Sequence, residues 1–178
     1  MKKTILTAIG VLIAVTASNA AEASHRGFRF SAHLSGLEEV PSIISEGSGS
    51  ATFRLFGDRI EYELTIDSLE GEVLFTHIHI GQKGANGGVS TFLCDNTGNP
   101  NAGGAPPCPQ SGVVSGTVRA EDVIGPAAQG VEANDFQGLV EAIFSGVAYV
   151  NTHSDLFPAG ELRGQIDRRG FSRFFGRD

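Results

Sequence analysis

The alternation of apolar and polar residues between positions 60 and 67 is the feature that most constrains the fold. The residues there are, in order, Ile60, Glu61, Tyr62, Glu63, Leu64, Thr65, Ile66 and Asp67. Successive side chains of a β-strand point to opposite faces of a sheet. The segment is therefore predicted to be a strand with one buried face and one wet, acidic face.

The same period of two recurs along most of the chain. Strands are predicted at residues 28–34, 51–55, 60–67, 74–81, 89–93, 113–118, 147–152 and 162–166. Gly57 and Asp58 mark a turn that joins the second and third of these strands into a hairpin. Many short strands with frequent turns predict an all-β domain, an antiparallel β-sandwich or barrel.

One segment, residues 134–144, departs from this pattern. Its apolar residues recur at helical spacing, at Phe136, Leu139, Val140 and Ile143. Asn134 or Asp135 is suited to cap the start of a helix, and Gly146 is suited to end it. We therefore expect one short helix against the sheet.

The first 23 residues have the pattern of a secretory signal peptide. Lys2 and Lys3 precede an apolar run from Ile5 to Val15, and small residues follow, so that cleavage fits after Ala20 or after Ala23. The run is shorter than the roughly 20 residues that span a bilayer. The expected product is an exported protein, periplasmic, cell-surface or secreted, with no transmembrane segment after signal cleavage.

The composition is acidic, which bears on the kind of partner. Lys and Arg number 13 against 20 Asp and Glu, a formal net charge of −7 at pH 7, and loss of Lys2 and Lys3 with the signal peptide makes it more negative. Nucleic-acid binding needs a basic face, so no nucleic-acid partner is expected. The β domain is expected over residues 28–167. An Arg- and Phe-rich tail at 168–178 follows, either disordered or a contact segment.

Cys94 and Cys108 are the only cysteines, and they bracket a stretch rich in turn-forming residues. An even pair of cysteines in an exported chain predicts a disulfide bond. A role as metal ligands is less favoured, because neither cysteine has a nearby histidine or a Cys-x-x-Cys partner.

Three histidines carry the main chemical signal. His77 and His79 are two residues apart, so a strand places both on one face and Ile78 on the core face. Residues 75–79 are weakly similar to 149–153, which suggests that two such strands lie side by side and bring His153 to the same surface. Three imidazoles from two strands make either a metal site, with copper or zinc preferred, or a polar contact patch.

Polar residues near these histidines are candidates for supporting roles. Glu161 is placed to orient a metal-bound imidazole by a hydrogen bond, and Asn151 or His33 to lie at the rim of the site. Arg163 is suited to bind an anion or to pair with Glu39. The alternative is structural: the rings hydrogen-bond to Glu161, Asn151 or backbone, and Glu161 with Arg163 forms a salt bridge between sheet edges.

Four ordered stretches resemble the chordin-type (CHRD) domain family. They are residues 30–41, 77–81, 149–153 and 160–165. The resemblance extends over about residues 28–167, with the loop between Cys94 and Cys108 as an apparent insertion. It implies an extracytoplasmic, mostly antiparallel β domain and suggests a binding module, but it brings no established catalytic residues.

Three functions follow from these features. The first is an exported binding module, with an unknown protein or surface partner, whose histidines hold copper or zinc. The second is a copper redox enzyme, since copper-zinc superoxide dismutases also carry a His-x-His strand on the outside of a β-sandwich. The third is a structural or adhesive domain of the cell surface. The sequence has no Ser nucleophile elbow and no His-Glu-x-x-His motif, so no catalytic residue is assigned and an enzyme is the less favoured class.

Overall fold

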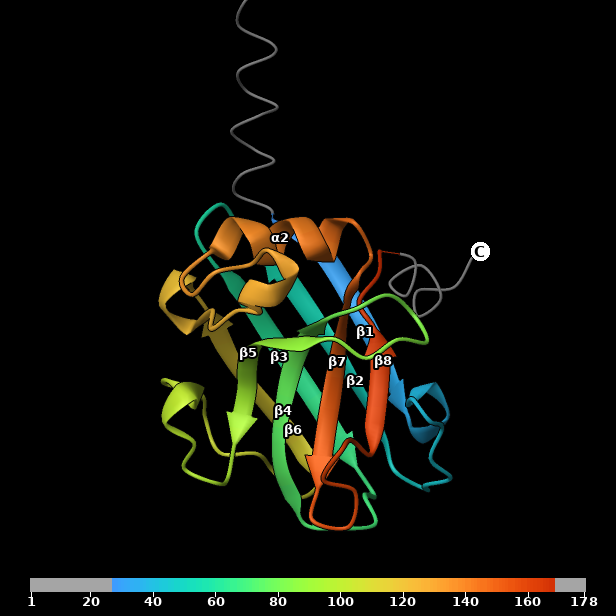
Figure 1. Ribbon diagram of the computed structural model, residues 1–178. Helices are drawn as coiled ribbons and strands as arrows, with labels where there is room; N and C mark the ends of the chain where they lie inside the picture. Colours follow the sequence, from blue (N-terminus) through green and yellow to red (C-terminus); the bar gives the residue numbers. More distant parts are fainter. Residues whose placement is uncertain (1–26, 169–178) are drawn as a thin grey trace, which may run out of the picture.

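One antiparallel sheet of eight strands makes up most of the computed structural model, which describes residues 27–168 (Figure 1). The strands are β1 (Phe28–Ser35), β2 (Ser48–Leu55), β3 (Ile60–Asp67), β4 (Val73–Ile80), β5 (Gly88–Asp95), β6 (Gly112–Val118), β7 (Ala148–Ser154) and β8 (Leu162–Gln165). Every strand pair is antiparallel, which confirms the all-β prediction. The predicted signal peptide and residues 169–178 of the predicted tail lie outside the described residues.

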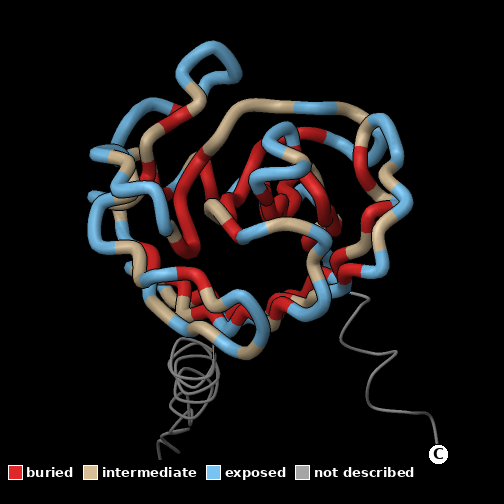
Figure 2. The backbone as a smooth tube through the Cα atoms, turned by 90° about the horizontal axis from the view of Figure 1, so that it is seen from below, coloured by how far each residue is buried: buried red, intermediate tan, exposed pale blue. Residues whose placement is uncertain are grey.

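The sheet curls into a nearly closed barrel. Its strand order is β5-β4-β7-β8-β1-β2-β3-β6, and the backbone forms a ring when viewed from below in Figure 2. Tyr62 on β3 spans the gap between the two sheet edges, because its hydroxyl donates a hydrogen bond to the carbonyl of Leu93 on β5. Of the two architectures that the sequence left open, the structure has the barrel.

The barrel interior contains the apolar half of the alternating pattern. On β3, Leu64 is fully buried while Glu63 on the opposite face is exposed. Leu64 pairs with Ala51 of β2 and Val114 of β6, so that apolar residues of three neighbouring strands share the inner face. Burial of such side chains is the main favourable contribution to folding.

The predicted helix is present as α2 (Phe136–Phe144), which covers one end of the barrel in Figure 1. The Asp135 side chain caps it by accepting a hydrogen bond from the Gly138 amide, and Gly146 follows its end with a φ of 71°. Short 3₁₀ turns lie at η1 (Gly36–Glu38), η2 (Pro100–Ala102), η3 (Ala120–Asp122) and η4 (Ala127–Gln129). Among the described residues, no helix has the length and apolar character needed to cross a membrane.

The two cysteines lie at bonding distance, as the sequence predicts. The sulfur atoms of Cys94, on β5, and Cys108 are 2.03 Å apart. Asn96 supports the loop that they close, because its side-chain amide donates to the carbonyls of Val73 and Cys108. The loop is thereby tied to the start of β4.

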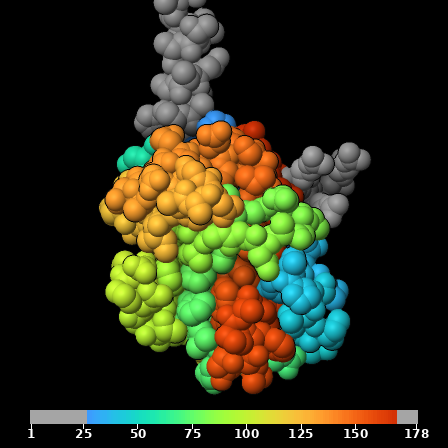
Figure 3. Space-filling view, in the orientation of Figure 1, coloured from blue at the N-terminus to red at the C-terminus, as the bar shows by residue number. Residues whose placement is uncertain are grey.

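Loops cover the outer face of the sheet over β4, β7 and β8. Every residue of β7 is buried, so this strand is covered on both faces. Residues 82–87, which we call the strap, belong to the loop that connects β4 to β5 along the chain. The strap crosses the outer face in front of β7 (green in Figures 1 and 3). The strap covers the place where the outward side chains of β4 and β7 meet.

Candidate metal centre

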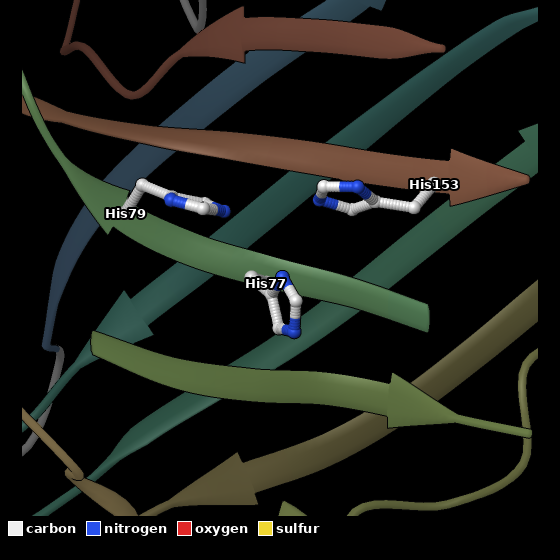
Figure 4. Close-up of side chains that lie close together, drawn as sticks. All are labelled: His77, His79 and His153. Carbon is white, nitrogen blue, oxygen red and sulfur yellow. The ribbon is translucent and has the colours of Figure 1, made fainter. Parts of the chain in front are cut away.

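His77 and His79 on β4 and His153 on β7 lie together on the covered outer face of the sheet (Figure 4). Strands β4 and β7 are paired, with Phe75 opposite His153 and His79 opposite Tyr149. The two strands thus lie side by side, as their similarity in sequence predicts. The alternation holds as well, because Ile78 between the two β4 histidines belongs to the core.

The three rings are close enough to share an ion after a small movement. Each offers one ring nitrogen, and these atoms all lie within 4.8 Å of one another. Metal–nitrogen bonds of about 2.0 Å place two ligand nitrogens no more than about 4 Å apart. The widest separation therefore has to shrink by roughly 1 Å, which a small rotation about side-chain bonds achieves.

Backbone carbonyls fix the tautomer of two of the rings. The Nδ1 atom of His79 lies 3.0 Å from the carbonyl oxygen of Gly87, and that of His153 lies 3.0 Å from the carbonyl oxygen of Pro158. A carbonyl only accepts, so each Nδ1 donates and each Nε2 of the neutral ring carries a lone pair. Metal-binding histidines are oriented in this way by a bond from the second nitrogen.

Four ring nitrogens of the cluster have no hydrogen-bond partner among the described residues. In the part of the chain that the structure describes, Nε2 of His79, Nε2 of His153 and both ring nitrogens of His77 are buried without a hydrogen bond. The His77 ring packs against Phe75 and Phe92, with ring centroids 4.7 and 4.2 Å away. A buried polar atom without a partner costs about 1–3 kcal/mol, so the cluster is unfavourable to folding unless it binds something.

Burial keeps all three imidazoles neutral at neutral pH. It lowers the pKa of His77 to about 3, with further lowering from the neighbouring His153 and His79. It lowers the pKa of His79 to about 4, partly opposed by the hydrogen bond to Gly87. The pKa of His153 is also lowered by burial. Neutral imidazole is the form that binds a metal ion.

We expect the metal-free protein to lose stability as the pH falls from about 6.5 to about 4. In this window the unfolded histidines, with pKa values near 6.5, bind protons that the folded ones exclude, and each pKa unit corresponds to about 1.4 kcal/mol. The free energy of unfolding should thus be constant just above pH 6.5 and several kcal/mol lower near pH 4. Urea unfolding at each pH measures it. A variant without His77 should show a smaller loss, and an equal loss would contradict the assignment.

Glu161 does not orient a histidine, contrary to the expectation from the sequence. It is fully buried, and its carboxylate accepts hydrogen bonds from Ser45, the Glu70 amide and the Ser154 hydroxyl. The carbonyls of Gly87 and Pro158 take the role that we expected of Glu161. The sequence could not reveal this, since every residue carries a carbonyl.

Asn151 also bonds away from the rings. Its side-chain amide donates to the carboxylate of Glu39 and to the carbonyl of Leu162. Burial raises the pKa of Glu39, and the hydrogen bond from Asn151 opposes that rise. Asn151 lies opposite His77 on the neighbouring strand, but its side chain connects β7 to the loop after β1.

Arg163 lies beside the cluster, where it holds the strap. Its guanidinium is 3.6 Å from the ring centroid of Tyr149 and donates to the Asn86 side chain and to two strap carbonyls. It makes no ion pair with Glu39 among those that the described residues form. His33 is exposed on β1 and is not part of the cluster.

Tyr149 is a site residue that the sequence did not single out. Its ring stacks on His79, with centroids 4.9 Å apart and planes 11° from parallel. The feature of the sequence that could have pointed to Tyr149 is its position two residues before Asn151, which places both side chains on the same face of the strand. The sequence alone gave no reason to choose it over other aromatic residues.

These features define an antiparallel β-barrel domain with a buried three-histidine cluster beneath loops on its outer face. The chain belongs to the CHRD domain family, whose profile matches residues 30–166. No match is found among curated proteins or among solved structures. CHRD domains are extracellular protein-interaction modules, which agrees with the expected protein or surface partner, and the disulfide fits an extracellular setting.

Proposed function

We propose that this protein is an exported CHRD-domain binding module that holds a metal ion with His77, His79 and His153. One observation carries the proposal: buried ring nitrogens without hydrogen bonds converge from two strands. Two of these nitrogens, Nε2 of His79 and of His153, carry lone pairs directed by bonds at Nδ1. A cation that accepts one lone pair from each ring satisfies three of the four nitrogens at once and leaves only the N–H of His77 without a partner among the described residues.

The alternatives for the histidines have less support. A polar contact patch has to be accessible to a partner, but the three residues are only 5–7 % exposed. A structural role would satisfy all the ring nitrogens with protein groups, but the carbonyls of Gly87 and Pro158 satisfy only one nitrogen each of His79 and His153. His77 has no such partner among the described residues.

Copper is the metal that we favour, ahead of zinc. Imidazole nitrogens suit copper and zinc, whereas calcium and magnesium prefer oxygen ligands. The cluster contains no carboxylate among the described residues, so the ion's charge is not neutralised by its ligands. Burial beside Phe75 and Phe92 costs less for a single charge than for a double one, and copper has a monovalent state.

Export and domain limits are part of the proposal. The signal-peptide pattern of residues 1–23, the disulfide and the family all support an extracytoplasmic location. The binding domain is proposed at 28–167, with the Arg- and Phe-rich tail at 168–178 outside it. The copper redox alternative gains no support from Arg163, because the guanidinium that would guide an anion bonds to the strap instead.

Titration of copper and zinc into the purified protein, with competing chelators, tests the metal site. Wild type should bind one ion per chain, and His79→Ala should weaken binding by more than about 100-fold, because even residues that only orient ligands contribute 10–100-fold. His33→Ala is the matched control, since His33 is exposed and outside the cluster. Equal affinities of the two variants, or no binding by folded wild type, would refute the proposal.

A further inference from the structure

One buried side chain, Arg163, makes more of the strap's hydrogen bonds than any other, while Lys83 also pairs with Glu38 and the Asn86 amide donates to the Val40 carbonyl. Arg163 on β8 is 2 % exposed. Its guanidinium donates to the carbonyls of Gln82 and Ala85 at 3.2 and 2.8 Å and to the side-chain oxygen of Asn86 at 3.1 Å. Charge-assisted bonds from a rigid guanidinium fix a loop in one geometry. Arg163 therefore contributes the largest share of the hydrogen bonds that set the position of the strap.

Tyr149 connects this arginine to the histidine cluster. Strand β7 lies between β4 and β8, so Tyr149 lies between His79 on one neighbour and Arg163 on the other. The guanidinium is 3.6 Å from its ring centroid, and the His79 ring is stacked at 4.9 Å. The three side chains form a continuous stack along the sheet.

Gly87, at the end of the strap, forms hydrogen bonds with both Tyr149 and His79. Its amide donates to the Tyr149 hydroxyl at 3.1 Å, and its carbonyl accepts from Nδ1 of His79 at 3.0 Å. A Cβ at this position would lie 1.7 Å from the carbonyl oxygen of Ile80, so the close approach requires glycine. Gly87 is therefore held in place by Tyr149, and its carbonyl in turn orients the His79 ring.

We propose that Tyr149 and Arg163 are positioning residues of the metal site, which hold the strap so that the Gly87 carbonyl fixes the tautomer and orientation of His79. This inference rests on the proposed function for its effect on metal affinity. Its effect on His79 itself does not depend on a metal. His153 provides an internal reference, because its Nδ1 donates to Pro158 in a different loop.

The test compares Tyr149→Phe with Tyr62→Phe. Each removes one buried hydroxyl and keeps the ring, but Tyr62 bonds to Leu93 on β5 and does not contact the histidines. In the metal-free protein, nitrogen NMR of the rings should show His79 with its proton on Nδ1 in wild type and in Tyr62→Phe. In Tyr149→Phe, His79 should become a mixture of tautomers while His153 stays unchanged.

Copper affinity is the second readout. We expect it to fall about 10-fold in Tyr149→Phe, at the lower end of the range for groups that orient ligands, and to stay at the wild-type value in Tyr62→Phe. Arg163→Lys keeps the charge but loses the planar fork, and it should reproduce the His79 change of Tyr149→Phe. The lysine ammonium is not expected to make all three hydrogen bonds that the Arg163 guanidinium makes to the strap, because it lacks the planar geometry.

The outcomes separate the inference from the proposed function. If wild type binds no metal but Tyr149→Phe alters the His79 tautomer, the metal proposal fails and the positioning of His79 stands. If wild type binds metal and Tyr149→Phe leaves both the tautomer and the affinity unchanged, the positioning role is overturned. A change that affects His153 as much as His79 also overturns it, because general loosening would act on both rings.

Discussion

Leu64→Asp is expected to unfold the domain. Leu64 is fully buried on β3, between Ala51 and Val114 of the neighbouring strands. A carboxylate there would face the apolar interior of the barrel without a partner, at a cost of several kcal/mol. Single domains are stable by only about 5–15 kcal/mol, so most of that stability would be lost. Circular dichroism with urea unfolding measures the change.

The adjacent residue supplies the control for this prediction. Glu63 lies on the opposite face of β3 and is exposed. Glu63→Ala should change the free energy of unfolding by no more than about 0.5 kcal/mol, as is usual for surface substitutions. Similar losses in the two variants would contradict the assignment of inner and outer faces.

His77→Phe is expected to stabilise the metal-free protein and to abolish metal binding. The His77 ring is buried against Phe75 and Phe92, and both its nitrogens lack hydrogen bonds among the described residues. Phenylalanine has a similar shape and no polar atom to desolvate, so the variant should gain about 1–3 kcal/mol. Urea unfolding without metal measures the gain.

The sign of this effect distinguishes a binding site from a structural one. Tyr62→Phe removes a hydroxyl that already has a partner in Leu93, so it should cost about 1 kcal/mol. If the free energy of unfolding rises in His77→Phe and falls in Tyr62→Phe, then His77 destabilises the metal-free fold. Residues that serve binding often have this effect. A loss of stability in His77→Phe would show that the ring supports the fold.

Local patterns in the sequence were sufficient for the elements of the fold. The alternation at residues 60–67 places Leu64 inside and Glu63 outside, and the helix begins beside Asp135, one of two predicted caps. The choice between sandwich and barrel was not predictable, because it depends on strand order. The pairing of β1 with β8 joins residues far apart in the sequence, and no local pattern records it.

The candidate site was predictable where it follows strand geometry and not where it depends on loops. The period of two brings His77 and His79 together, and the similarity of two segments brings His153 beside them. The partners of these rings are carbonyls of Gly87 and Pro158. They come from loops whose paths are set by Arg163 and other distant contacts, so Glu161 was the wrong choice.

Metal retained after dialysis is the most direct test of the central claim. Wild type and His77→Phe are exposed to copper or zinc, dialysed, and analysed for metal content and by X-ray absorption. We expect one ion per wild-type chain, bound by three imidazole nitrogens at about 2.0 Å, and none in His77→Phe. No retained metal in folded wild type, or the same amount in both proteins, would contradict it.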